Sequence, residues 1–296
     1  MRRIYLTDDM FYEVYQNGSR TIYAPSKELK SQQRQILNFI KTKYKIKLNA
    51  KECAQVHCRQ KWILKLDIRK FFESFTEKQI RDVVDEIFEN VTFPEYYDKF
   101  VIYDLCTVEN KLPTGAVTSS YFANIAFANT QIDDRLIEFC IQNKLNYSRY
   151  MDDMFFSGRN KSDLKRAEKL AIKLLKESGF NINHEKTQYI SENKRQEILG
   201  LVVNNKENCV IPCDTKHAYR SMFFNYLKAV YLEERLGINS LFKKRVGFKE
   251  ISGYLAYIKM SDPKFYGIMK NFITSKADKF GLSKNKEVKK LTKMLK

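Results

Sequence analysis

The sequence predicts an α+β fold, and three observations lead to this prediction. Short apolar segments rich in β-prone residues flank polar turns, as in YSRYMDDMFFSG at Tyr147–Gly158. Between such segments lie stretches whose apolar residues recur with the period of an amphipathic helix. From about Asp214 onwards the chain becomes helical, basic and aromatic in character. With 296 residues, 44% hydrophobic and 30% charged, the chain is long enough for two or three subdomains.

The N-terminal part is predicted to form a β-hairpin followed by a helix. Asn17-Gly18 lies between two β-prone runs within Phe11–Ala24, and this dipeptide favours a tight hairpin turn. The next stretch, PSKELKSQQRQILNFIKTKY, has five apolar positions at helical spacing. These positions are Leu29, Ile36, Leu37, Ile40 and Tyr44.

A further strand and three further helices are predicted in the middle of the chain. Trp62–Phe75, WILKLDIRKFFESF, opens as a strand, and Thr76–Gln79 (TEKQ) is a capping box that begins an amphipathic helix. Leu112–Asn124, LPTGAVTSSYFAN, starts with turn residues and leads into a helix that we expect to run through Ile132 or beyond. Ser162–Ser178 has the pattern of another amphipathic helix.

Carboxylates at the end of the apolar segments indicate a metal site. Asp152 and Asp153 interrupt an aromatic hairpin, where two adjacent carboxylates are unfavourable unless a cation lies beside them. Mg²⁺ prefers such hard oxygen ligands. Asp67, near the end of an apolar strand, would complete a cluster able to hold two metals about 3.5–4 Å apart, as phosphoryl transfer requires. A solvent-exposed acidic turn is the alternative interpretation. Another pair, Asp133-Asp134, is not set between aromatic strands.

The composition indicates a polyanionic partner. The formal net charge is +18 and the sequence pI is about 9.5, which favours nucleic acid. Between Leu241 and Lys296 there are 15 Lys and Arg against 4 Asp and Glu. The six cysteines show no CxxC spacing and are interpreted as reduced thiols. Because no run approaches the roughly 18 apolar residues of a membrane span, and no signal peptide is apparent, we expect a cytoplasmic protein without a membrane partner.

Three motifs, in this order, resemble those of a known enzyme family. Asp67 followed by Phe71-Phe72, then LPTGAVTSS at Leu112–Ser120, then YMDD at Tyr150–Asp153, resemble palm motifs A, B and C of reverse transcriptases. The resemblance covers nearly the whole chain. It implies a right-hand polymerase with fingers, a palm whose antiparallel sheet packs on helices, and a helical thumb. The implied boundaries are 1–62 for the fingers with 76–110 as an inserted segment, 63–208 for the palm and 209–296 for the thumb.

Other segments resemble the bacterial retron-type reverse transcriptases. RTIYAPSKELKSQQ is close to the retron pattern, and CAQVH at Cys53–His57 matches it except that Cys53 replaces an Asn. Ile198-Leu199-Gly200 stands where these proteins have Val-Thr-Gly, and it keeps the glycine.

The resemblance implies a catalytic role for five residues. Asp67 and Asp152 would hold two Mg²⁺ ions, with Mn²⁺ as an alternative, helped by the backbone carbonyl of Ile68 and supported by Asp153. Lys186, within NINHEKTQYI, takes the place of the lysine that protonates the departing pyrophosphate.

The resemblance also implies contacts with the incoming deoxynucleoside triphosphate and the primer. Arg20 and Lys27 would contact the triphosphate, although a solvated surface cation is an equal interpretation of Lys27. Phe72 would exclude a ribose 2′-hydroxyl, and a core Phe is its alternative. The remaining contacts would come from the turn before the third helix and from the YMDD motif: Thr114, Gly115, Tyr150 and Met151. The family usually has Gln at the position of Thr114. The Gln amide contacts the sugar, and Thr cannot reproduce this contact.

A retron-type enzyme would use a structured noncoding RNA as template and primer. Its product would be a branched RNA–DNA molecule primed from a guanosine 2′-hydroxyl, and family members serve in phage defence with an effector protein. Two alternatives remain open. One is a diversity-generating or abortive-infection reverse transcriptase, which the departures at Cys53, Thr114 and Leu199 allow. The other is an RNA-binding scaffold with an idle polymerase site, although the intact trio of aspartates argues against it.

Overall fold

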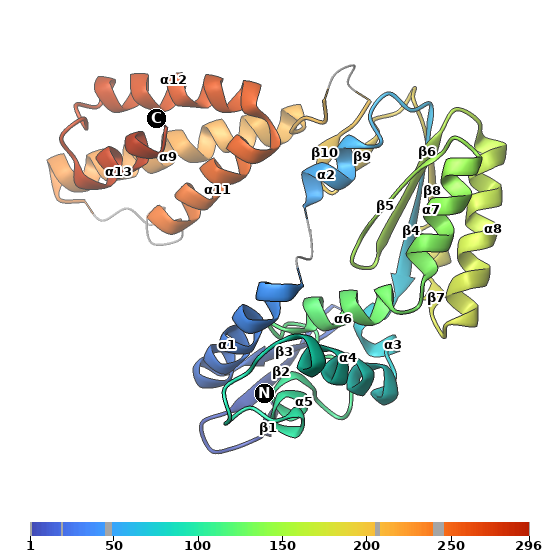
Figure 1. Ribbon diagram of the computed structural model, residues 1–296. Coiled ribbons are helices and arrows are strands. Elements are labelled where there is room, and N and C mark those ends of the chain that lie inside the picture. The colour runs from blue at the N-terminus through green and yellow to red at the C-terminus, as the bar shows by residue number, and fades with distance from the viewer. Residues whose placement is uncertain (1, 19, 45–48, 205–207, 239–245, 296) are drawn as a thin grey trace. The chain divides into compact units, whose positions relative to one another are not determined.

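The computed structural model describes residues 2–18, 20–44, 49–204, 208–238 and 246–295. The chain divides into two compact units, coloured by residue number in Figure 1. The first unit comprises Met1–Asn49 and Gln60–Ser191, and the second comprises Ala50–Arg59 and Glu192–Lys296. No helix in the described ranges combines the length and the apolar character needed to cross a membrane.

The first unit begins with a three-stranded antiparallel sheet and a helix. Its strands, in the order β1-β2-β3, are β1 (Arg2–Tyr5), β2 (Phe11–Asn17) and β3 (Arg20–Pro25). Asn17 pairs with Arg20 and Gly18 has a φ of +61°, so the predicted hairpin is confirmed. The helix α1 (Lys27–Lys43) follows at once, capped by the Ser26 hydroxyl, which accepts from the Leu29 N–H at 3.3 Å.

The second sheet of this unit has five strands, all paired antiparallel. They are β4 (Trp62–Arg69), β5 (Asn146–Tyr150), β6 (Asp153–Gly158), β7 (Asn181–Ile182) and β8 (Gln188–Ser191). The strand order is β5-β6-β4-β7, and β8 pairs with β4 beside β7. The central strand β4 is therefore hydrogen-bonded to neighbouring strands along both of its edges. An α+β fold with an antiparallel sheet is confirmed.

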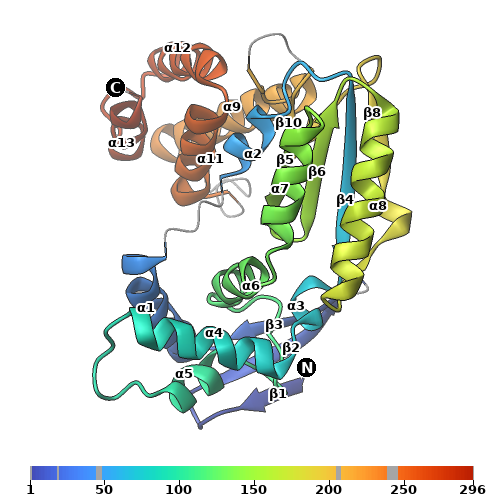
Figure 2. The ribbon, with the colours of Figure 1, turned by 45° about the vertical axis from the view of Figure 1, so that its right-hand side comes forward.

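Helices pack on this sheet and enclose an aromatic core. The helices of the first unit after α1 are α3 (Phe71–Ser74), α4 (Glu77–Asn90), α5 (Lys99–Cys106), α6 (Ser119–Ala128), α7 (Ile132–Gln142) and α8 (Lys161–Glu177), with the 3-10 turn η1 (His184–Lys186). α7 and α8 run side by side along the sheet (Figure 2). The predicted capping box before α4 is present in full. Four buried rings, with centroids 5.1–6.2 Å apart, join α3 and α6 to the segment after α8: Phe71, Phe75, Phe127 and Phe180.

One predicted helix is wrong in its extent. We expected the helix that starts after LPTGAVTSS to run through Ile132, but α6 ends at Ala128 and α7 begins at Ile132. Gln131 adopts a left-handed conformation with a φ of +57°. The Thr130 hydroxyl donates to the Phe127 carbonyl at 2.6 Å, a local bond that competes with helix continuation.

The break between α6 and α7 lies next to a buried ion-pair network at the turn of the β5–β6 hairpin. The Arg149 guanidinium donates to both carboxylate oxygens of Asp133 at 2.8–3.1 Å and lies 4.1 Å above the Phe127 ring. The same guanidinium donates to the Asn124 side-chain oxygen and to the Met151 carbonyl, each at 3.0 Å. One side chain thus ties the hairpin turn to α6 and α7.

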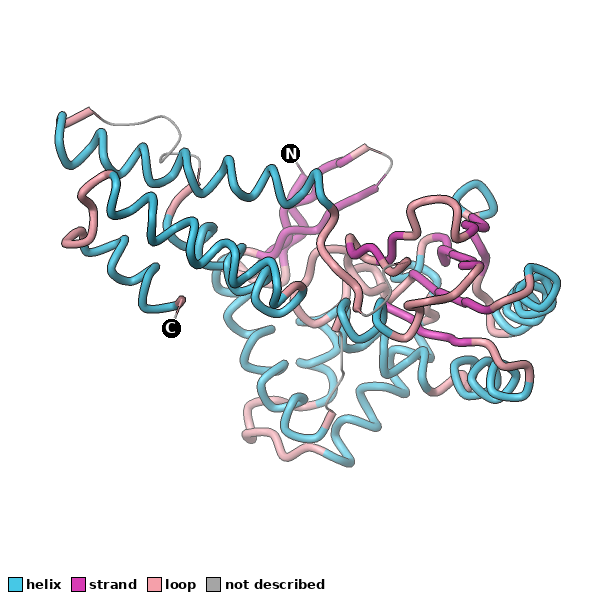
Figure 3. Tube along the Cα trace, turned by 90° about the horizontal axis from the view of Figure 1, so that it is seen from above, coloured by secondary structure: helices cyan, strands magenta, loops and turns pink. Residues whose placement is uncertain are grey.

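The second unit is mostly helical in its described part (Figure 3). A short helix, α2 (Ala50–Gln55), packs against the hairpin of β9 (Glu197–Ile198) and β10 (Leu201–Val202). The longer helices are α9 (Cys213–Leu236), α11 (Phe248–Ser261), α12 (Pro263–Lys279) and α13 (Lys286–Met294). The predicted helical character of the C-terminal part is confirmed.

The buried polar residues of the second unit include Asp262 and His57. Asp262 caps α12 by accepting from the Phe265 N–H at 2.9 Å and pairs with the Lys216 ammonium at 2.7 Å. His57 has no exposed surface, and burial lowers its pKa to about 3. All six cysteines are free thiols.

We predict that Arg149→Met lowers the free energy of unfolding by about 2–4 kcal/mol, because it leaves the Asp133 carboxylate partly buried without a cation. Urea unfolding followed by circular dichroism measures the change. Arg135→Met is the matched control, since its ion pair with Glu177 is exposed on both sides and should contribute about 0–1 kcal/mol. Equal effects of the two substitutions would contradict a structural role for the buried pair.

We predict that His57 makes the protein sensitive to mild acid. The folded-state pKa is about 3 and the unfolded value is about 6.5, so between these values the unfolded chain binds one more proton. This contribution to stability is complete above pH 6.5 and is lost by about 1.4 kcal/mol per pH unit below it, or about 2 kcal/mol at pH 5. Urea unfolding at pH 7 and pH 5 should show this difference for the parent protein and lose it in His57→Gln. The exposed His217→Gln should behave as the parent does.

Candidate active site

The antiparallel pairing of β4 with β6 brings together the three aspartates that the sequence singled out. Asp67 on β4 lies directly opposite Asp153 on β6. Directly opposed residues of an antiparallel pair lie about 4.5–5.5 Å apart at their Cα or Cβ atoms. The Ile68 N–H donates to the Asp152 carbonyl at 2.9 Å and so attaches the hairpin turn to the end of β4. Three acidic residues from distant parts of the sequence therefore share one edge of the sheet.

The electrostatics of this edge are those of a site short of positive charge. Burial, together with the charges of Asp152 and Asp67, raises the pKa of Asp153 to about 6. Burial, with a contribution from Asp67, also raises the pKa of Asp152, and the Arg20 and Lys186 cations oppose this rise. The Lys186 ammonium lies 3.0 Å from Asp67 Oδ2. Burial is the largest cause of both shifts, and repulsion among the carboxylates adds to it, so the neighbouring cations do not offset the two effects together.

These carboxylates are suitable ligands for a hard cation, although they are not arranged as a metal cage. Within the described part of the chain, no group of three or more His, Cys, Asp and Glu side chains is gathered closely enough to hold a metal ion. The Lys186 ammonium pairs with one oxygen of Asp67, where a metal would compete with it. The site offers only oxygen donors, and its carboxylates are partly buried and repel one another. Such a site fits Mg²⁺ or Mn²⁺ better than a softer metal.

The YMDD residues form the predicted hairpin turn. Tyr150 pairs with Asp153, which leaves Met151 and Asp152 as the two residues of the loop. Met151 has a left-handed backbone, with a φ of +58°, and its side chain is buried. A left-handed backbone is uncommon for a residue other than glycine. Arg149 holds this conformation by donating to the Met151 carbonyl, and the Asn124 amide lies 2.9 Å from the Met151 sulfur.

The turn at Thr114-Gly115 docks on β3. The Tyr23 N–H donates to the Thr114 carbonyl at 2.8 Å. Gly115 has a φ of +112°, and a Cβ atom there would lie 2.8 Å from the Tyr23 carbonyl oxygen, so only glycine fits. Arg20 lies three residues earlier on β3 and is near enough to Asp152 to oppose the rise of its pKa. The docking thus brings Arg20 toward the carboxylates.

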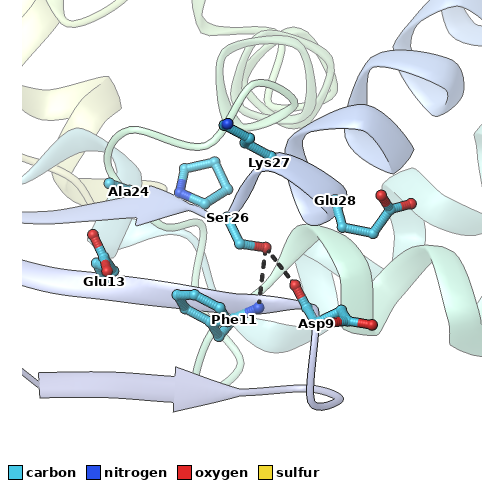
Figure 4. Close-up of a pocket in the computed structure, with 8 residues that line it drawn as sticks. Asp9, Phe11, Glu13, Ala24, Ser26, Lys27 and Glu28 are labelled. Carbon is cyan, nitrogen blue, oxygen red and sulfur yellow. Dashed lines mark hydrogen bonds between the residues drawn. The ribbon is translucent and has the colours of Figure 1, made fainter.

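Phe72 and Lys27 lie in surroundings that do not by themselves indicate a nucleotide. Phe72 is partly buried on α3, where its ring centroid is 5.6 Å from that of Phe71. Lys27 points away from Glu28 at the start of α1 and lines a hollow of about 620 Å³ (Figure 4). The other charged residues of that hollow are acidic, and none of the three clustered aspartates lines it: Asp9, Glu13 and Glu28.

Sequence reasoning missed four residues that hold this site in place. Asp133 belongs to an acid pair that is not set between aromatic strands. Arg149, Asn124 and Tyr23 lie within the quoted motif segments, but the motifs assign no role to these three residues. The position of Arg149, two residues before the loop, is the one signal that could have drawn attention to it. Its partners lie on helices whose packing the sequence does not reveal.

The chain matches the model of the reverse transcriptase (RNA-dependent DNA polymerase) family over residues 16–203. It is 24% identical to the retron Ec86 reverse transcriptase of Escherichia coli, an alignment that covers 95% of this chain and 86% of that protein. Identity to the Escherichia coli retron Ec83 enzyme is 25%, over 94% of this chain and 90% of the relative. Identity to the retron Ec73 reverse transcriptase of the same species is 28%, over 84% of this chain and 81% of the relative.

Among solved structures, telomerase from Candida albicans in complex with a fragment of telomeric RNA is similar with a TM-score of 0.44. The sequence identity is 12%, and the match covers 96% of this chain and 61% of that chain.

The family match spans more than half of the chain, and it includes Arg20, Lys186 and all three clustered aspartates. The similarity to retron enzymes extends over most of the chain and most of each of these relatives. The chain therefore belongs to the reverse transcriptase family and is an RNA-directed DNA polymerase of the retron type.

Proposed function

We propose that the chain copies a structured noncoding RNA into DNA, with nucleotidyl transfer at Asp67, Asp152 and Asp153. One observation carries the proposal above all: β4 and β6 pair in the register that sets Asp67 opposite Asp153. A shift of one residue would turn one of these carboxylates to the other face of the sheet. The bond from the Ile68 N–H to the Asp152 carbonyl fixes the third acid beside them.

In this proposal Asp67, Asp152 and the Ile68 carbonyl hold two Mg²⁺ ions, with Mn²⁺ as a substitute, and Asp153 supports the cluster. The bound ions would lower the pKa of the primer 3′-hydroxyl and neutralise charge on the triphosphate. The raised pKa values of Asp152 and Asp153 support this assignment, because partly buried carboxylates that also repel one another are stabilised by a bound dication.

Lys186 is the proposed general acid for the departing pyrophosphate. Its ammonium is bound to Asp67 Oδ2 at 3.0 Å, and its side chain is half exposed. A long side chain in that position can leave the carboxylate and reach a leaving oxygen nearby without a change in the backbone. A donor must come within hydrogen-bond distance of the oxygen that it protonates.

The remaining proposed contacts surround the incoming deoxynucleoside triphosphate and the primer. Arg20 would bind the triphosphate, a role supported by its charge interaction with Asp152. Lys27 would bind it only after leaving the acidic hollow that it lines. Phe72 would exclude the 2′-hydroxyl. The other proposed contacts are Thr114 and Gly115 at the sugar and Tyr150 and Met151 at the primer end.

We further propose that the product is a branched RNA–DNA molecule primed from a guanosine 2′-hydroxyl, and that it serves with an effector protein in defence against phage. The relatives' identity as retron reverse transcriptases supports this. In this assignment residues 1–62 are the fingers with 76–110 inserted, 63–208 the palm and 209–296 the thumb. The thumb, basic and helical, would bind the structured RNA.

We predict that Asp152→Asn reduces primer extension on an RNA template to background, because the neutral amide is a weaker metal ligand. Extension by the parent protein should require Mg²⁺ or Mn²⁺ and stop on chelation. Incorporation of labelled dNTPs measures both. Asp134→Asn, an exposed acid at the start of α7, is the matched control and should retain the parent rate. Undiminished extension by Asp152→Asn, with an unchanged melting temperature, would refute the assigned role.

We predict that Phe72→Val raises the use of ribonucleotides relative to deoxynucleotides, because removal of the ring opens space beside the sugar. The ratio of kcat/KM for ATP and dATP should rise by roughly 10-fold or more, which corresponds to about 1.4 kcal/mol of discrimination. Phe88→Val also trims a partly buried core Phe and should leave the ratio unchanged. An unchanged ratio in Phe72→Val would identify Phe72 as a packing residue.

A further inference from the structure

The second unit carries an aromatic hollow that the polymerase site does not use. Its volume is about 430 Å³, and its lining comes from α9 and α11: Tyr219, Glu250, Gly253, Tyr254 and Tyr257. The four residues on α11 recur at i, i+3, i+4 and i+7 and so share one face of that helix. Three of the five lining residues are tyrosines.

The tyrosine rings are grouped but not sealed from solvent. The centroids of Tyr219 and Tyr254 are 5.5 Å apart, with their planes at 49°. Burial is the largest cause of a raised pKa at Tyr219, and the nearby Tyr257 and Tyr254 hydroxyls add to it. The Tyr254 side chain nevertheless remains 41% exposed. Partly exposed aromatic rings are the surfaces on which unpaired nucleobases stack.

Gly253 keeps the hollow open. It lies in the interior of α11, where glycine is destabilising relative to alanine. A Cβ atom at this position would meet no atom within 4 Å, so packing does not require glycine here. Gly253 lines the hollow beside Tyr254 and Tyr257, and the lack of a side chain at this position leaves that part of the hollow unfilled.

The charge of the unit suits a nucleic acid, and the chemistry of the hollow suits particular bases. The sequence of this unit has 24 Lys and Arg against 11 Asp and Glu. The one carboxylate of the hollow, Glu250, accepts from the Gly247 N–H at 2.9 Å and can only accept further hydrogen bonds. It therefore fits a base with an exocyclic amino group, such as adenine.

We infer that this hollow binds an unpaired base of RNA, which stacks on Tyr254 while an amino group of the base donates to Glu250. The inference rests on the proposed function in taking a structured RNA as the partner. It adds a contact with unpaired nucleotides through residues of the second unit, none of which is assigned to nucleotidyl transfer. Such a contact distinguishes an RNA with exposed loops from a uniform duplex.

The test measures the affinity of the full chain for a short, fluorescently labelled single-stranded oligoadenylate by anisotropy at a fixed salt concentration. A blunt RNA duplex of equal length is the comparison ligand. Tyr254→Ala should weaken single-strand binding roughly 10-fold, within the range for loss of one stacked base. Tyr254→Phe should bind within about twofold of the parent, because the ring is kept. Binding of the duplex should change little in either variant.

Gly253→Leu provides the decisive variant, since it fills the hollow with a residue that favours helix and should preserve or raise the melting temperature. It should weaken oligoadenylate binding as Tyr254→Ala does. Gly267→Leu is the matched control: Gly267 is also an exposed glycine inside a helix, α12, with no atom near a built Cβ, and it lies outside the hollow. Parent-like oligoadenylate binding by Gly253→Leu would overturn the inference and leave the hollow to a protein partner.

Extension of a pre-annealed DNA primer on an RNA template separates this inference from the proposed function. An inactive parent protein that still binds oligoadenylate through Tyr254 would refute the polymerase proposal alone. A Gly253→Leu variant that is active and binds oligoadenylate with undiminished affinity would refute only the inference that the hollow binds a base.

Discussion

The geometry of the aspartate cluster depends on one buried guanidinium. Arg149 contacts α7 through Asp133, α6 through Asn124 and the aromatic core through Phe127, and it binds the carbonyl of Met151. A left-handed residue followed by a half-buried aspartate is unfavourable as an isolated turn. The network stabilises this turn, and the pairing of β4 with β6 then presents Asp152 and Asp153 beside Asp67. A cation with no proposed contact to the substrate thus positions the residues that are proposed to hold the metal ions.

A second constraint joins the two sheets of the first unit. The bond between Tyr23 and the Thr114 carbonyl connects β3 with the loop that leads into α6, and Gly115 permits the close approach. The same helix α6 carries Asn124 and Phe127 of the Arg149 network. The hairpin that contains Arg20 and the turn that contains Asp152 are therefore both attached to α6. Displacement of this helix would disturb both sides of the site.

Local chemistry determined which features the sequence could predict. Asn17-Gly18, the capping box after Thr76 and the YMDD hairpin are specified by neighbouring residues, and all three form as expected. The end of α6 at Ala128 and the pairing of Arg149 with Asp133 depend on contacts between distant segments, and the sequence pattern carried no trace of them. The convergence of the aspartates was predicted through the order of the motifs, whereas their charge balance required the positions of Lys186 and Arg20.

The docking of β3 on the Thr114-Gly115 turn also determines which positions are open to variation. At Thr114 the carbonyl makes the bond to Tyr23, so the identity of the side chain does not affect the docking. At the neighbouring Gly115 any Cβ atom would collide with the backbone of Tyr23. Substitutions at residue 114 can therefore change the side chain that is proposed to contact the incoming sugar, while the adjoining glycine keeps the docking of β3 unchanged.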